Sequence, residues 1–90
     1  MFRLWTKVIK NNKMINDLVI ENDDRDLNRT KKVFKAIDDI CYEFDLAKPI
    51  WLEANISDFK KHDKTRFSHD NFIESIDFDY LEIEVIEEDD

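Results

Sequence analysis

Hydrophobic residues recur at every second position in residues 2–9 and again in residues 14–21. This period of two is typical of β-strands, because successive side chains of a strand point to opposite faces. The polar residues 10–12 between the two segments favour a tight connection. The pattern therefore predicts an N-terminal β-hairpin.

The length of the hairpin loop decides which side chains share a face, because a one-residue slip exchanges the two faces of a strand. A two-residue loop would place the apolar face of the first strand beside Asp17 and Glu21. A three-residue loop with Asn12 in the left-handed conformation gives one clean apolar face instead, and asparagine tolerates that conformation. We therefore expect the longer loop and the pairs Val8–Met14, Leu4–Leu18 and Phe2–Ile20.

Apolar residues next recur at steps of three and four, which predicts one long amphipathic helix over about residues 28–45. Asp26 or Asn28 is a suitable N-cap, and Pro49 follows the end of the helix. The expected buried side chains of this helix are Val33, Phe34, Ile37, Ile40, Cys41 and Phe44.

The second half of the chain predicts two short helices and a last strand. Asn55 is expected to cap a helix ending near His62, and Ser68 to cap one that carries Phe72, Ile73 and Ile76. Residues 78–87 alternate again, with Leu81, Ile83 and Val85 facing the core and Glu82 and Glu84 facing outward. We expect an α+β fold in which the last strand joins the hairpin in the order 2-1-3. The single domain covers residues 1–87, and the acidic tail 88–90 frays.

Composition narrows the function. The chain has 90 residues and no glycine, so it lacks the glycine-dependent loops of phosphate-binding, dinucleotide-binding and nucleophile-elbow motifs. A formal net charge of −8 argues against nucleic-acid binding. No apolar run approaches a membrane span, and the first residues lack the apolar core of a secretion signal. We expect a soluble cytoplasmic protein without a cofactor.

Charge is distributed unevenly along the chain. Residues 1–16 contain basic residues and no acid, whereas residues 67–90 contain ten acids and neither lysine nor arginine. A basic first strand and an acidic last strand would be favourable neighbours in one sheet. Two separately solvated ends are the alternative, and the sequence does not decide between them.

Two His-Asp pairs, His62-Asp63 and His69-Asp70, form the one spacing that suggests a metal or acid–base site. Four basic residues lie among these pairs and would repel a cation, so surface histidines are the favoured interpretation and no metal is expected. Cys41 falls on the buried stripe of the long helix and is expected to pack as a small apolar residue.

The second face of the hairpin is the favoured candidate for partner binding. Four large apolar residues and four charged residues share it: Trp5, Ile9, Ile15 and Val19, with Arg3, Lys7, Asp17 and Glu21. An apolar centre with a charged rim is typical of protein interfaces. Either the last segments of the chain cover this face, or a protein partner does so, including a second copy in a homodimer.

The segments KPIWLEANISDFKKHDKTRF and FDYLEIEVIEEDD, with FDLAKP before them, resemble a family of small uncharacterised bacterial proteins. The resemblance implies an intact bacterial domain and carries no site residue.

These observations favour a non-enzymatic protein-interaction or regulatory module that self-associates through the Trp5 face. A metal-binding protein or metal-assisted hydrolase that uses His62 and His69 is one alternative. An acidic inhibitor that imitates nucleic acid with its last strand is the other.

Overall fold

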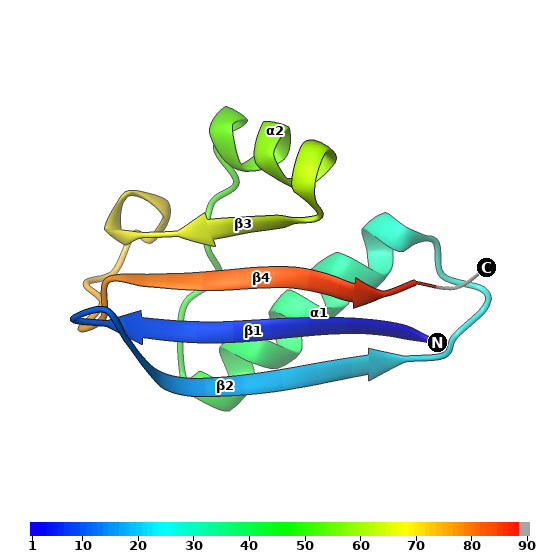
Figure 1. Cartoon of the computed structure of the whole chain (residues 1–90), viewed down its shortest axis with the longest axis horizontal. Helices are drawn as coiled ribbons and strands as arrows, with labels where there is room; N and C mark the ends of the chain where they lie inside the picture. Colours follow the sequence, from blue (N-terminus) through cyan, green and yellow to red (C-terminus); the bar gives the residue numbers. More distant parts are fainter. Residues whose placement is uncertain (89–90) are drawn as a thin grey trace.

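The computed structural model describes residues 1–88 and has an α+β fold with one antiparallel sheet (Figure 1). The strands lie in the order β2-β1-β4-β3. The elements are β1 (Phe2–Lys10), β2 (Lys13–Asn22), α1 (Arg29–Phe44), α2 (Glu53–His62), β3 (Lys64–Phe67), a 3-10 turn (His69–Asn71) and β4 (Tyr80–Glu87).

The hairpin has the expected faces but not the expected loop. Asn11 and Asn12 both have positive φ, 53° and 64°, in a two-residue turn that joins Lys10 to Lys13. Ile9 then pairs with Met14 and Val8 with Asn16, so the intervening residue of β2 is a β-bulge. This extra residue restores the alignment of the two apolar faces, and Leu4 lies opposite Ile20 rather than Leu18.

Helix α1 matches its predicted range within one residue at each end, and the side chain of Asn28 caps it by accepting a hydrogen bond from the Lys31 N–H. Val33, Ile37, Ile40 and Cys41 are buried as expected. The prediction for Phe34 was wrong, because this residue is 51% exposed. The contact stripe of the helix runs through Ala36, whose small side chain is buried, and leaves Phe34 at the margin.

The connection between α2 and β4 differs most from expectation. Residues 64–67 form strand β3, so the order 2-1-3 was incomplete, although β1 does lie between β2 and the last strand. The second short helix reduces to the 3-10 turn, and Ile73 beyond it is 87% exposed. Asn55 is the third residue of α2 rather than its cap, and its side chain accepts a hydrogen bond from the Leu52 N–H.

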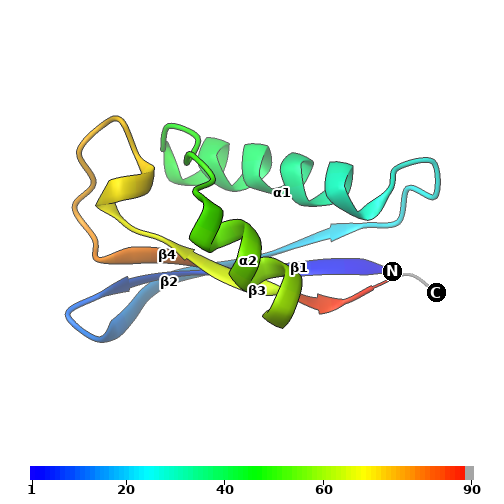
Figure 2. The same ribbon diagram turned by 90° about the horizontal axis from the view of Figure 1, so that it is seen from above.

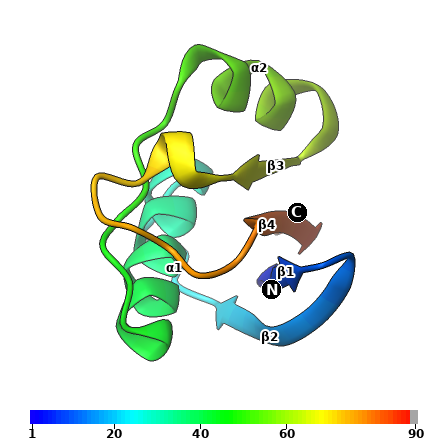
Figure 3. The same cartoon turned by 90° about the vertical axis from the view of Figure 1, so that its left-hand side faces the viewer.

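The core lies between the sheet and α1. Helix α1 covers one face of the sheet, while α2 lies beyond the edge strand β3 (Figures 2 and 3). Apolar residues of β1, β3 and β4 pack against the helix: Phe2, Leu4, Val8, Phe67, Leu81 and Ile83. No helix covers the opposite face of the sheet within residues 1–88, and the hairpin candidate lies there.

Candidate functional site

Basic β1 and acidic β4 are neighbours in the sheet, which decides the charge question left open by the sequence. Arg3 forms ion pairs with Glu21 on β2 and Glu87 on β4. The Lys7 ammonium lies 2.8 Å from a Glu82 carboxylate oxygen and 3.6 Å from one of Glu84. The cations of β1 on the open face are therefore paired with glutamates of the same chain.

Glu82 is the centre of this ion-pair network. Its carboxylate accepts a hydrogen bond from Arg66 at 3.1 Å in addition to its contact with Lys7. Burial disfavours ionisation of Glu82, but the hydrogen bonds from Lys7 and Arg66 outweigh that cost and lower its pKa. Burial likewise opposes the charge on Lys7, and the contacts with Glu82 and Glu84 raise its pKa.

Glu82→Gln is expected to lower the free energy of unfolding at neutral pH by about 1–3 kcal/mol, because Lys7 and Arg66 lose a charged partner. A carboxyl group whose pKa is lowered by folding stabilises the native state above its ordinary value of 4.5. That contribution disappears as pH falls through the lower native value. Urea unfolding at several pH values should therefore show the wild type and the variant converging in acid. A difference that stays constant with pH would contradict this role of Glu82.

The residues proposed for partner binding differ in their exposure, and one of them does not lie on the open face. Trp5 is half-buried. Its indole N–H donates a hydrogen bond to the Asp17 carboxylate at 3.0 Å, and the Lys7 ammonium lies 4.0 Å from its ring centre. Ile9 is half-buried, and Val19 is 43% exposed. The bulge residue Ile15 lines a hollow with Phe44 of α1, which places it toward the helix side. Met14 lies opposite Ile9 instead, on the face of the hairpin where Ile15 was expected.

The two His-Asp pairs lie on separate elements and have separate surroundings. His62 ends α2, and the carboxylate of Asp63 pairs with Arg29. His69 and Asp70 form an exposed contact of 3.4 Å with each other in the 3-10 turn. Within residues 1–88, no three His, Cys, Asp or Glu side chains form a group that could hold a metal ion.

Cys41 is buried on α1, and its thiol lies 3.7 Å from the carbonyl oxygen of Ala47. Burial and the nearby Asp38 carboxylate raise the pKa of this thiol. A thiol with a raised pKa is a poor nucleophile, which agrees with its predicted packing role.

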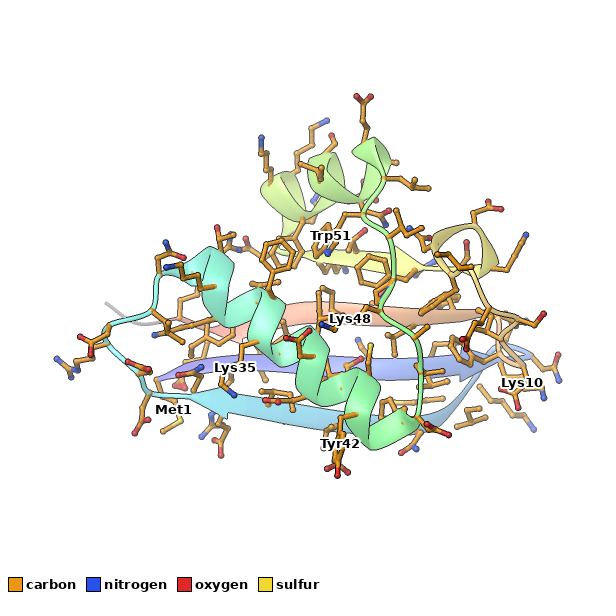
Figure 4. All side chains as sticks on the ribbon, turned by 180° about the vertical axis from the view of Figure 1, so that it is seen from behind. Met1, Lys10, Lys35, Tyr42, Lys48 and Trp51 are labelled. Atoms are coloured by element: carbon orange, nitrogen blue, oxygen red, sulfur yellow. The ribbon has the colours of Figure 1, made fainter. Side chains whose placement is uncertain are left out.

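A groove between α1 and α2 is the feature that sequence reasoning missed. Trp51 lies between the two helices (Figure 4), on the extended segment that joins them. Its ring meets three other aromatic rings edge to face, with centre-to-centre distances of 6.1 Å to Phe34, 5.5 Å to Phe59 and 5.1 Å to Phe67. Such T-shaped pairs fix the orientation of the indole.

Buried amide side chains hold the segment that carries Trp51. The Asn71 side chain donates hydrogen bonds to the Ile50 carbonyl at 2.8 Å and to the Asn55 side-chain oxygen at 2.7 Å. The same Asn55 oxygen accepts from the Leu52 N–H at 3.0 Å. Both neighbours of Trp51 are therefore fixed by hydrogen bonds, and the groove is preformed.

The groove has a volume of about 300 Å³ and is predominantly apolar. Phe34 and Ile56, which form part of its walls, are 51% and 43% exposed. Two cations, Arg29 and Lys60, also line it, and no carboxylate does so among the described residues. The full lining is Arg29, Thr30, Val33, Phe34, Trp51, Ile56, Phe59 and Lys60.

The sequence held one signal for this groove, namely more large apolar residues than the predicted core positions needed. Residues 50–52 are consecutively apolar, and such a run on a short extended segment cannot bury every side chain in one layer. Ile50 and Leu52 are indeed 46% and 43% exposed. Their partners on the two helices, however, are distant in sequence.

No protein-family model, curated protein or solved structure matches the chain. The resemblance to a bacterial family therefore stays a prediction. Within residues 1–88, no helix combines the length and the apolar character needed to cross a bilayer.

Proposed function

We propose that this protein is a non-enzymatic interaction module whose docking surface is the groove between α1 and α2. The observation that carries the proposal is the half-exposed pair of Phe34 and Ile56 beside the fixed indole of Trp51. A preformed apolar hollow with a few polar groups at its margin is the usual form of a binding site. Aromatic residues are also the side chains that most often dominate interface energetics.

The groove is favoured over the open face of the sheet because the two surfaces differ in whether their basic side chains already form ion pairs within the chain. On the open face the two cations of β1, Arg3 and Lys7, are each paired with glutamates of the same chain. In the groove, Lys60 forms no ion pair with any residue of the described part of the chain. Self-association through Trp5 and Val19 is the second proposal, and it rests on the absence of a covering segment within residues 1–88.

The two alternative functions have less support. The His-Asp pairs of a metal-assisted hydrolase lie on different elements, and Arg29 engages Asp63. The glutamates of β4 that would imitate a nucleic-acid backbone are contacted by Arg3, Lys7 and Arg66. A carboxylate already paired within the chain offers less attraction to a basic partner.

A selection of randomly displayed peptides against the wild-type protein tests the proposal. Ile56 and Val19 are both 43% exposed, so Ile56→Glu and Val19→Glu are matched variants of the groove and the open face. We expect enriched peptides to bind Ile56→Glu at least about tenfold more weakly than wild type and Val19→Glu unchanged. Both variants should retain the wild-type far-UV spectrum, because both side chains are at the surface.

Two results would contradict the groove proposal. Loss of peptide binding in Val19→Glu alone would transfer the docking surface to the open face of the sheet. Selection that enriches no sequence above background would remove the peptide-docking role of the groove.

A further inference from the structure

We infer that the partner of the groove is an amphipathic helix that carries carboxylates beside its apolar face. This inference rests on the proposed function and adds the chemistry of the ligand. Three properties of the groove support it: its local charge, the satisfied backbone of its walls and its size.

The two charged side chains that line the groove are both basic, although the protein as a whole is acidic. The chain has a formal net charge of −8, yet the groove lining contains Arg29 and Lys60 and, among the described residues, no carboxylate. Arg29 already pairs with Asp63 and Glu88, and its guanidinium carbon lies 5.1 Å from the ring centre of Phe59. Lys60 has no such partner within residues 1–88, so it is the cation that a bound carboxylate would meet.

The walls of the groove favour a helical partner over an extended one. An extended peptide gains affinity by hydrogen bonding to an exposed strand edge. Here most lining residues belong to the helices α1 and α2, whose interior backbone groups bond within each helix, and the backbone on both sides of Trp51 bonds to the side chains of Asn55 and Asn71. A partner must therefore bind through side chains and satisfy its own backbone groups, as a helix does.

The size of the groove limits what enters it. A volume of about 300 Å³ lies at the lower end of the range for small-molecule sites. It suits a few apolar side chains from one helix face, spaced three or four residues apart, while the partner backbone stays outside. An acidic residue next to these anchors would then lie at the margin with Lys60.

Trp51 provides a direct reporter, because Trp5 and Trp51 are the two tryptophans of the chain. In a Trp5→Phe background, fluorescence titration would use three helical peptides with the same apolar face. Their flanking positions carry glutamate, glutamine or lysine. We expect the glutamate peptide to bind about tenfold more tightly than the glutamine peptide at low salt, with the lysine peptide weakest.

Lys60→Glu is expected to reverse this order, so that the lysine peptide binds most tightly. Lys61→Glu is the matched control, because Lys61 is the next residue of α2, is also exposed and does not line the groove. It changes the net charge equally and should keep the order of the wild type. Ile56→Glu should weaken all three peptides.

The possible outcomes distinguish failure of the proposed acidic helical partner from failure of the groove as a docking surface. Equal affinity for the three peptides, still lost in Ile56→Glu, would overturn the acidic partner and leave the groove as a docking surface. An equal effect of Lys60→Glu and Lys61→Glu would overturn the specific contact with Lys60. Binding of displayed linear peptides at the groove without binding of any helical peptide would overturn the helical partner. Failure of every helical and every displayed peptide to bind would overturn both the acidic helical partner and the groove as a docking surface.

Discussion

Ile40→Ala is expected to lower the free energy of unfolding by about 2–5 kcal/mol, because the side chain is fully buried and its loss leaves a cavity. Phe34→Ala on the same helix removes a larger side chain but should cost only about 1 kcal/mol, since Phe34 is half-exposed and contributes mainly its edge contact with Trp51. The smaller deletion is thus expected to have the larger effect.

Urea unfolding followed by far-UV circular dichroism measures both variants. The same two proteins also separate stability from binding, because Phe34→Ala should weaken peptide binding while its fold persists. If Phe34→Ala lowers the free energy of unfolding as much as Ile40→Ala does, Phe34 is a core residue and does not form an exposed wall of the groove.

Asn71→Ala is expected to cost about 3 kcal/mol, because the buried Asn71 side chain makes three hydrogen bonds and each such bond contributes about 0.5–1.5 kcal/mol. The Ile50 carbonyl and the Ser68 N–H both lose their bonds to the Asn71 side chain. The Asn55 side chain loses one donor and retains its bonds to Thr65 and to the Arg66 carbonyl.

The same substitution should alter Trp51, since the Ile50 carbonyl next to it is released. A shift in the Trp51 emission in the Trp5→Phe background is therefore expected together with the loss of stability. Asn16→Ala is the control, because within residues 1–88 the exposed Asn16 side chain bonds only to the adjacent Asp17 N–H, and its cost should stay below about 0.5 kcal/mol. Equal costs for the two variants would contradict a structural role for the Asn55–Asn71 pair.

The sequence predicted the elements whose signal is local. The period of two in the hairpin and the helical spacing of residues 28–45 were confirmed, because each reflects one face turned to a core. The predicted order 2-1-3 also placed the last strand beside the first one correctly, whereas the charge pattern alone left this neighbour undecided. The bulge after Met14 was not predictable from alternation, since alternation constrains which faces meet and not how many residues the turn contains.

The missed features depend on contacts between distant residues. Strand β3 has only four residues, and its alternation of Thr65 and Phe67 inward with Lys64 and Arg66 outward is too short to be distinctive. Asn55 and Asn71 are 16 residues apart in the chain, and Phe34 contacts Trp51, which lies on the extended segment that their hydrogen bonds hold. The acidic tail was expected to fray, yet Glu88 pairs with Arg29, while residues 89–90 lie outside the described residues.

Intermolecular nuclear Overhauser effects between the protein and the bound glutamate peptide would locate the docking surface residue by residue. We expect contacts from the peptide's apolar side chains to the Ile56 methyl groups and the rings of Phe34 and Trp51. We expect none to the methyl groups of Val19, which is equally exposed on the open face of the sheet. Contacts to Val19 and Trp5, with none to Ile56, would contradict the claim that the groove between α1 and α2 is the docking surface.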